Sequence, residues 1–187
     1  GHEGVLALQK LADEGDADAL SQLGELYVEG NAYIHKDISK GFNCWKEAAA
    51  LGDVAAMFKC ALLHLHGHYK DNRKIVHNFY KERTIPHGLV LMSKAAEKGC
   101  EYACYMLGKA YATGRYDLPV CTVTARKYFS QMPECAMQMS ADTERRKYAA
   151  DYIKEYEDVK SGAMEEEEEE KEEWEQDGEE EEEWEEE

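Results

Sequence analysis

The feature that most constrains this chain is a stretch of 16 residues that occurs three times. Residues 15–30 read GDADALSQLGELYVEG, residues 52–67 read GDVAAMFKCALLHLHG, and residues 99–114 read GCEYACYMLGKAYATG. A glycine opens and closes each copy, and small and apolar residues recur between the glycines at the spacing of one helix face. The copies begin 37 and then 47 residues apart, and a period of this size is typical of a solenoid of stacked helix pairs.

The stretches between these copies repeat as well. A pattern of Gly, two apolar residues, Ala-Ala and Gly covers residues 41–52 and returns in residues 88–99. Residues 4–15 fit the same frame. The sequence therefore predicts repeats that start at residues 15, 52 and 99. A half repeat over residues 4–14 precedes them and supplies only the second helix of a unit.

These residues resemble the Sel1-like repeat family, which is related to the tetratricopeptide repeats. The family pattern is roughly G-x-x-x-A-x-x-x-L-G-x-x-Y-x-x-G, then a loop, then A-x-x-W/Y-x-x-x-A-A-x-x-G. Residues 15–52 match it nearly throughout, with Gly41 where the family usually has Ala. The resemblance covers about residues 4–132 and implies an all-α, right-handed α-solenoid of about three helix-pair repeats. We expect the solenoid to occupy residues 1–139.

Within each repeat, the pattern indicates how two helices pack. Asp16 follows the first glycine and is suited to cap the helix that begins there. An apolar stripe with a spacing of four residues should face the core, formed in the first copy by Ala19, Leu23 and Tyr27. The three copies have a small residue at one equivalent position: Gly24, Ala61 and Gly108. Because the partner helix can approach closely there, a large side chain at Gly24 or Gly108 should be severely destabilising.

The negative charge of the chain is concentrated at its C-terminal end. Of a net charge of −18, nearly all lies in residues 165–187, which carry 17 Glu and one Asp against one Lys. Runs of like charge repel and cannot pack, so the Glu-rich tail over residues 161–187 is predicted to be disordered. Trp174 and Trp184 interrupt the tail, as in segments that bind basic proteins, although a purely solvating role is the alternative. Before the tail, residues 140–160 have an amphipathic pattern that predicts a helix capping the solenoid.

An insert over about residues 68–87 lengthens the second repeat interval. It is the most basic segment of the chain, with five cations: Lys70, Arg73, Lys74, Lys81 and Arg83. Its apolar residues suggest a helix that is longer than the family standard and that breaks before Pro86: Ile75, Val76, Phe79 and Tyr80. Insertions in repeat arrays are often functional. The insert could therefore bind the acidic tail of the chain, or it could be a solvated extension.

The six cysteines do not suggest a disulfide framework. Members of the family that bacteria secrete join neighbouring helices by a regular Cys pair, but here the partner position of Cys104 is Ala96. Buried free cysteines behave as small hydrophobic residues, so we expect a reducing compartment, cytoplasmic or nuclear. The sequence contains no apolar run of the ~18 residues that a membrane span needs. It also shows no signal-peptide pattern.

Two patterns could indicate a metal site, but simpler roles account for them. His64, His66 and His68 alternate, and the first and third would share a face if their helix continued. His64, however, occupies the position that tyrosine holds in the other two copies, which predicts a core residue. Cys100 and Cys104 also have helical spacing, but no matched ligands lie nearby in the sequence. We therefore expect neither a metal site nor a cofactor.

In helix-pair solenoids the first helix of each repeat lines the concave face, where partners bind. Positions off the core stripe run from acidic through apolar to aromatic along this face. The residues that we expect to bind a partner are Glu25, Val28, Phe58, Leu62, Leu65, Tyr102, Tyr105 and Lys109. Phe58 and Tyr105 occupy equivalent positions and would serve as aromatic anchors. The alternative is that both rings simply pack on the adjacent repeat.

The sequence shows no enzyme pattern: it has no glycine-rich phosphate loop, no Gly-x-Ser-x-Gly and no His-Glu-x-x-His. A net charge of −18 disfavours nucleic acid, because phosphate contacts dominate such affinity. We expect a non-enzymatic adaptor or scaffold that binds a peptide or helix of a partner protein and takes no small-molecule substrate. One alternative is a chaperone that binds basic proteins, such as histones or ribosomal proteins, through the acidic tail. Another is a structural subunit of a larger assembly.

Overall fold

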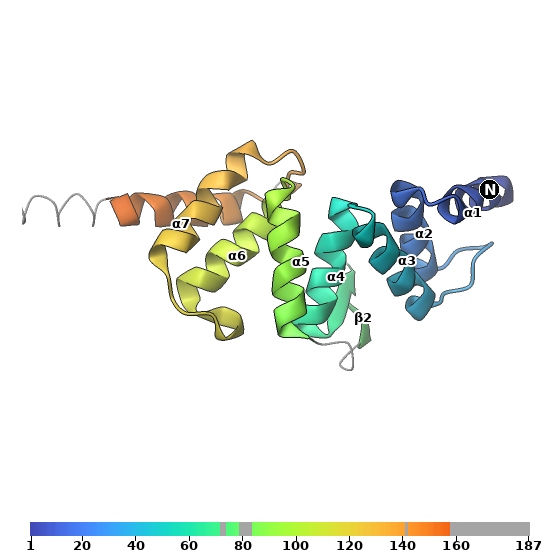
Figure 1. The fold of residues 1–187 in the computed structure, drawn as a ribbon, viewed down its shortest axis with the longest axis horizontal. Helices are drawn as coiled ribbons and strands as arrows, with labels where there is room; N and C mark the ends of the chain where they lie inside the picture. The colour runs from blue at the N-terminus through green and yellow to red at the C-terminus, as the bar shows by residue number, and fades with distance from the viewer. Residues whose placement is uncertain (72–73, 79–83, 141, 158–187) are drawn as a thin grey trace, which may run out of the picture. The chain divides into compact units, whose positions relative to one another are not determined.

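The computed structural model describes residues 1–71, 74–78, 84–140 and 142–157. The chain divides into two compact units, Gly1–Asp142 and Thr143–Glu187. The first unit is built from helices that follow one another along the chain (Figure 1). These are α1 (His2–Asp13), α2 (Ala17–Glu29), α3 (Ile38–Ala50), α4 (Val54–His66), α5 (Ile85–Glu97), α6 (Glu101–Thr113) and α7 (Thr122–Gln131). Two short 3-10 helices, η2 (Arg115–Asp117) and η3 (Met132–Glu134), follow α6 and α7.

The helices pack in pairs. Helix α2 packs on α3, α4 on α5, and α6 on α7. Contacts of α1 with α2, α3 with α4 and α5 with α6 join each pair to its neighbour. The predicted all-α fold of helix-pair repeats is therefore confirmed, because each pair covers the apolar face that the next pair leaves open.

The turns between successive pairs are built in the same way each time. After α3, Gly52 has a φ of 100°, a conformation that glycine adopts without steric cost. The amides of Gly52 and Asp53 donate to carbonyls in the last turn of α3, each at 3.0 Å, which is the Schellman geometry. Asp53 then caps α4, because its carboxylate accepts the Ala56 amide at 2.8 Å. The same backbone bonds recur at Gly15 and Gly99, so one motif ends a helix and starts the next.

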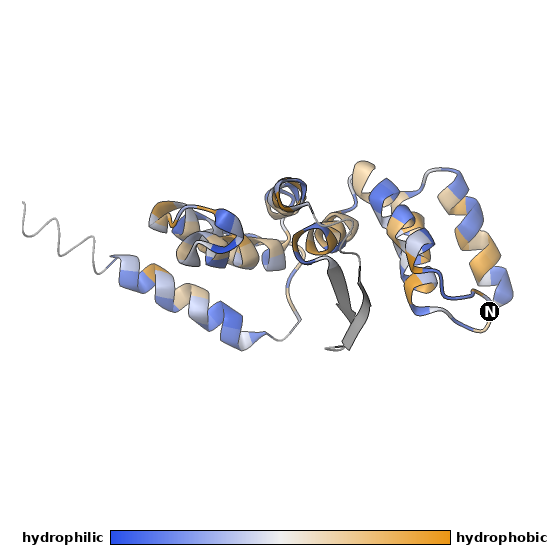
Figure 2. Cartoon of the chain, turned by 90° about the horizontal axis from the view of Figure 1, so that it is seen from below, coloured by the Kyte–Doolittle hydropathy of each residue, from blue (hydrophilic) through white to orange (hydrophobic). Residues whose placement is uncertain are grey.

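Small residues bring the two helices of a pair close together. A Cβ on Gly24 of α2 would lie 2.5 Å from the Trp45 ring of α3, and one on Gly108 of α6 would lie 2.5 Å from the Phe129 ring of α7. Both rings are only 1% exposed. The prediction that Gly24 and Gly108 accommodate the partner helix is confirmed. The helices are amphipathic: in Figure 2 each of them has both hydrophobic and hydrophilic residues. The hydrophobic residues of such a helix can pack against a neighbouring helix.

The basic insert differs from its prediction. Instead of a lengthened helix, it forms an antiparallel hairpin of β1 (His68–Asp71) and β2 (Lys74–Asn78), paired from His68–Asn78 to Asp71–Lys74. Helix α4 cannot continue, because Gly67 takes a left-handed conformation with a φ of 70°. The β-branched Ile75 and Val76 lie in β2, where such residues are favoured. Of the predicted basic patch, Lys70 and Lys74 lie in the strands, whereas Arg73, Lys81 and Arg83 lie outside the described residues, as do Phe79 and Tyr80.

The second unit begins with a helix over residues 143–157, within the range predicted for a capping helix. Tyr148 and Tyr152 stack on its surface, with ring centres 6.5 Å apart. Its role as a cap of the solenoid stays a prediction, and the predicted acidic tail over residues 161–187 lies outside the described residues. None of the helices that the structure describes is long and apolar enough to span a membrane.

Candidate functional site

An aromatic pair joins the first helices of two neighbouring repeats. Phe58 of α4 meets Tyr102 of α6 edge to face, with ring centres 5.1 Å apart and planes at 63°. Both side chains are half-buried. Edge-to-face contact is a favourable geometry for aromatic rings, so the two rings hold each other in place while part of each stays accessible.

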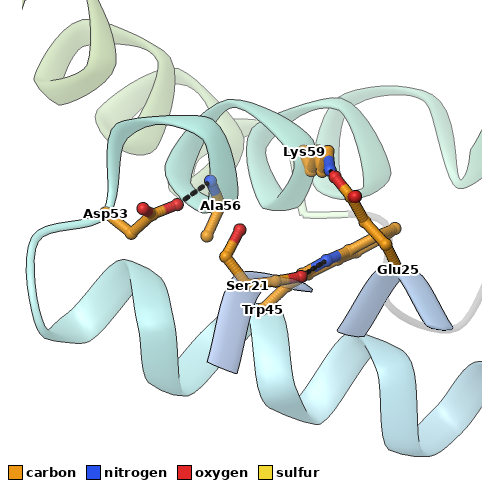
Figure 3. A network of polar contacts seen from close by, with 6 residues as sticks. All are labelled: Ser21, Glu25, Trp45, Asp53, Ala56 and Lys59. Carbon is orange, nitrogen blue, oxygen red and sulfur yellow. Dashed lines mark hydrogen bonds and ion pairs between the residues drawn. The ribbon is translucent and has the colours of Figure 1, made fainter. Parts of the chain in front are cut away.

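An ion pair joins the first helices of the first and second repeats. Lys59 of α4 pairs with Glu25 of α2, and its ammonium lies 4.9 Å from the centre of the Trp45 ring. The indole in turn donates from Nε1 to the Ser21 carbonyl at 3.2 Å; Figure 3 shows this network at the junction of α2, α3 and α4. The Lys59 side chain is 15% exposed and that of Glu25 is 50% exposed. Lys59 is therefore a fixed cation rather than a freely moving one.

These two contacts link α2 to α4 and α4 to α6, the first helices of the three repeats. Leu62 lies one turn after Phe58 and is half-buried. Lys109 lies two turns after Tyr102, is exposed, and holds its ammonium 5.9 Å from the centre of the Tyr105 ring. We refer to this set of residues on α2, α4 and α6 as the inner-helix strip. It consists of Glu25, Phe58, Lys59, Leu62, Tyr102 and Lys109.

Two residues predicted to bind a partner lie in the core instead. Val28 and Leu65 are buried. A Cβ on Gly41 of α3 would lie 2.6 Å from a methyl group of Val28, and one on Gly88 of α5 would lie 2.8 Å from Cγ of Leu65. The prediction for Val28 and Leu65 was wrong because each lies four residues after the small residue that faces the partner helix, and so shares that buried face.

The expectation that Tyr105 is an exposed anchor was also wrong. Tyr105 is buried, and its ring centre lies 6.2 Å from that of Phe129 in α7. The equivalent residue of the first repeat, Ser21, is buried too. Position 58 differs: Phe58 is half-buried, and its ring contacts Tyr102 of the next repeat. The aromatic surface is therefore formed by Phe58 and Tyr102.

Lys59 was missed by the sequence reasoning. Its neighbour Phe58 was selected from the equivalence of the repeats, whereas Lys59 becomes visible only when charges on neighbouring repeats are compared. Glu25 and Lys59 are 34 residues apart, which is three less than the first repeat interval of 37. Opposite charges that are separated by one repeat interval minus about one helical turn are therefore the sequence signal for this pair.

The histidines of α4 have packing roles. His64 is buried between Phe42 of α3 and His87 of α5, with ring centres 6.0 Å and 4.6 Å away, so its predicted core role is confirmed. Since α4 ends at His66 and His68 begins β1, the two outer histidines of the alternating pattern do not share a helix face. Among the described residues, no group of three or more His, Cys, Asp or Glu side chains could hold a metal ion.

The end of α4 contacts η2. The Nε2 of His66 and the Tyr116 hydroxyl form a hydrogen bond, and the two rings stack with centres 5.8 Å apart. Tyr116 and Asp117 both have a φ of 58°, which is uncommon for residues other than glycine. Burial raises the pKa of the Tyr116 hydroxyl, while Arg115 acts in the opposite direction. This contact holds the turn after α6 against the end of α4.

All six cysteines are free thiols. Cys104 lies 3.9 Å from the Ala96 carbonyl, but its nearest sulfur is that of Cys135, at 3.6 Å. Burial raises the pKa of the Cys104 thiol, and the adjacent Cys135 adds to this effect. Burial also raises the pKa of Cys60, to about 12. Thiols with these pKa values are poor nucleophiles at neutral pH, as expected for packing residues.

Cys121 should be the most reactive thiol of the chain. The Thr124 side chain lies 3.1 Å from its sulfur, and hydrogen bonds from the Thr124 side chain and backbone lower the pKa of this thiol. Because the thiolate is the nucleophile, Cys121 should react fastest with iodoacetamide at pH 7.5, and Thr124→Val should slow it. Cys44 is the matched control, since it is also half-buried but burial raises its pKa. Peptide mass spectrometry measures each rate, and equal rates for Cys44 and Cys121 would contradict the assignment.

Comparison with models of known protein families identifies repeats in this chain. The model of the Sel1 repeat matches residues 17–53, 54–74 and 101–132. The chain contains three Sel1 repeats. The matched segments cover the pairs α2–α3 and α6–α7 and the region from α4 into the hairpin. Comparison with curated protein sequences gives no match.

Solved structures of Sel1-repeat proteins have a similar fold. A protective antigen present in uropathogenic Escherichia coli strains, which displays the Sel1-like repeat fold, is 25% identical with a TM-score of 0.56. The match covers 70% of this chain but only 25% of the antigen, so this chain spans about a quarter of that protein. A Sel1 repeat protein from Oxalobacter formigenes is 20% identical with a TM-score of 0.61 over 79% of this chain and 98% of its own. The latter similarity concerns the fold alone.

Proposed function

We propose that this Sel1-repeat protein is a non-enzymatic scaffold whose inner-helix strip binds a peptide or helix of a partner protein. Sel1-repeat proteins generally mediate protein–protein interactions, and their solenoid is typically a scaffold rather than an enzyme. The finer part of the proposal is the location of the binding surface. It concerns the strip on α2, α4 and α6, in place of the wider set of residues that the sequence suggested.

The observation that carries the proposal is the half-buried pair of Phe58 and Tyr102. Aromatic side chains that are fixed before binding lose little conformational entropy, and they dominate the energetics of many interfaces. Leu62 extends the apolar area along α4 by one turn. The Glu25–Lys59 ion pair borders it on the side of α2, so the strip has an apolar centre with charged residues at its margins, as protein interfaces commonly have.

The proposal predicts that a partner peptide loses affinity when the aromatic pair is removed. A random peptide library displayed on phage is selected against the full chain, and the selected peptides are titrated by fluorescence anisotropy. The double variant Phe58→Ala/Tyr102→Ala should weaken binding by about tenfold or more. Leu62→Gln leaves both rings in place and should also weaken binding, whereas Asn43→Ala, exposed on α3, should not.

Two outcomes would overturn the proposal. One is a selection that yields no peptide, or only peptides whose affinity the double variant leaves unchanged while its circular dichroism spectrum stays that of the wild type. The other concerns the acidic tail: a chain that ends at residue 157 should bind the peptides as the full chain does. If binding requires residues 158–187 and falls steeply with added salt, charge in the tail is responsible and the strip is not the site.

A further inference from the structure

We propose that Cys104 and Cys135 form a site of reversible oxidation, at which a disulfide oxidant such as oxidised glutathione joins the two sulfurs. Cys104 lies in α6, and Cys135 follows η3. We refer to residues 135–139 as the post-η3 segment. In the reduced chain hydrogen bonds and packing hold this segment on α6, and oxidation adds a covalent bond. The proposal does not depend on the inner-helix strip, because it rests on different residues.

The sulfur atoms of this pair are already in contact. The Sγ atoms of Cys104 and Cys135 are 3.6 Å apart. A disulfide bond is about 2 Å long, so the two sulfurs must approach each other by only about 1.6 Å. Both residues are buried, at 0% and 5% exposed. Rotation of the two side chains can supply this approach.

The backbone of the post-η3 segment is fixed beside the start of α6. The Met137 amide donates to the Gly99 carbonyl at 3.0 Å, and the Met137 carbonyl accepts the Glu101 amide at 2.9 Å. The Met139 amide donates to the buried Glu101 carboxylate at 2.6 Å. These bonds hold the two thiols next to each other, which favours a reaction between them over reactions with thiols in solution.

The hydrogen bonds of the two thiols assign their roles. Cys135 donates to the Gln131 carbonyl at 3.3 Å, which leaves the Cys104 proton for the Cys135 sulfur. Burial raises the pKa of Cys135, and the hydrogen bond from Cys104 partly offsets this rise. For Cys104, burial and the adjacent Cys135 both raise the pKa. Cys135 is therefore the more easily ionised thiol of the pair and the one that attacks the oxidant.

The reaction consists of two thiol–disulfide exchanges. The Cys135 thiolate attacks one sulfur of oxidised glutathione, which forms a mixed disulfide and releases one glutathione thiolate. The Cys104 sulfur then loses its proton and attacks Sγ of Cys135, which releases the second glutathione thiolate. The two glutathione thiolates take up the two protons that the protein thiols lose. Two protein thiols and one molecule of oxidised glutathione thus give one protein disulfide and two molecules of reduced glutathione.

Cys100 is the competing thiol. It is buried at the N-cap of α6, one turn before Cys104, and its charged form would be repelled by that of Cys135. The sulfur that Cys135 contacts, however, is that of Cys104. We therefore expect the bond between Cys104 and Cys135 to form in preference to one that includes Cys100.

Peptide mass spectrometry detects the bond. The full chain is incubated with oxidised glutathione, quenched with acid, blocked with N-ethylmaleimide and digested with trypsin without reduction. We expect a linked pair of peptides, residues 99–109 and 128–145. Because the first peptide contains both Cys100 and Cys104, fragmentation of the linked pair assigns the bond to one of them. Treatment with dithiothreitol should remove the linked pair.

Single substitutions provide the controls. Cys104→Ala and Cys135→Ala should each abolish the linked pair of peptides. Cys100→Ala should retain it, and so should Cys60→Ala, which replaces a buried thiol on α4. Circular dichroism verifies that each variant is folded. The comparison of the oxidised with the reduced wild-type chain needs no substitution, so the proposal stays testable if a variant does not fold.

The bond should also stabilise the chain. Oxidation should raise the melting temperature by about 5–10 °C, because a link between residues 31 positions apart constrains the unfolded chain. Amide hydrogen exchange should become slower at Met137 and Met139, which lie in the post-η3 segment. The same oxidant should leave the melting temperature of Cys135→Ala unchanged.

Three results would overturn the proposal. The first is that the native chain gives no linked pair, or gives it only in urea, since the contact between the sulfurs would then have no chemical consequence. The second is a bond from Cys135 to Cys100 instead of Cys104. The third is an oxidised chain that melts at the same temperature as the reduced chain or at a lower one, which would mean that the bond does not hold the post-η3 segment on α6.

Discussion

Trp45→Ala is expected to lower the free energy of unfolding by about 3–5 kcal/mol. Among the residues whose burial the structure describes, Trp45 is the largest fully buried side chain, and its ring fills the space that Gly24 leaves open. The substitution also removes the Nε1 hydrogen bond to the Ser21 carbonyl and the ring beneath the Lys59 ammonium. Since natural domains are stable by only about 5–15 kcal/mol, this loss should bring the chain close to unfolding at room temperature.

Urea denaturation followed by far-UV circular dichroism measures the effect. Trp45→Phe is the first control: it keeps most of the ring but loses the N–H donor, so it should cost clearly less than Trp45→Ala. Asn43→Ala, on the same helix and exposed, should change the stability by less than about 0.5 kcal/mol. A Trp45→Ala variant as stable as Asn43→Ala would show that the junction of α2, α3 and α4 is not packed as described.

The helix pairs could be predicted from the sequence because the turns and caps that bound their helices involve residues close together in the sequence. The Gly52 turn and the Asp53 cap involve residues that adjoin in sequence, and the recurrence of Gly24, Ala61 and Gly108 marks the contact within each pair. The hairpin could not be predicted in this way. Its apolar residues, Ile75 and Val76 among them, suit a strand or a helix, and Gly67 could equally have been an ordinary break between two helices.

The candidate site was predictable only in part, because it depends on contacts between repeats. Periodicity identified Phe58 and Tyr102 separately, but that the two rings meet follows from how α4 and α6 are placed. Periodicity does not separate two apolar faces of one helix, which is why it predicted surface positions for the buried Val28 and Leu65. In a solenoid a helix contacts the other helix of its own pair and also a helix of the neighbouring pair. A prediction that assumes one apolar stripe for each helix overlooks one of these two contacts.

The contact of Cys104 with Cys135 shows the same limitation. The family pattern places the partner of Cys104 eight residues earlier, where this chain has Ala96. The nearest sulfur belongs to Cys135, 31 residues later and 3.6 Å away. It is brought there by the segment after η3, where Met137 exchanges backbone hydrogen bonds with Gly99 and Glu101. No repeat pattern extends to this segment, so its position follows from tertiary structure alone.

Gly108→Leu is expected to destabilise the chain by about 3 kcal/mol or more, at the upper end of the range for overpacked cores. Even a single Cβ at position 108 would lie 2.5 Å from Cε1 and 2.6 Å from Cδ1 of Phe129. The Phe129 ring cannot move aside easily, because it is buried and also contacts Tyr105. Helices α6 and α7 would therefore have to separate, which exposes the apolar surface between them.

The matched control for Gly108→Leu is Gly4→Leu, the same substitution on a helix with open space around the glycine. There the expected change is a gain of about 0.5–1 kcal/mol, because leucine favours the helix more than glycine does. Phe129→Ala in the Gly108→Leu background tests the mechanism. If the clash with the ring causes the loss, the double variant should be more stable than the sum of the two single effects predicts, by about 1–3 kcal/mol in a double-mutant cycle. Strict additivity would mean that Gly108 is needed for a reason other than the Phe129 ring.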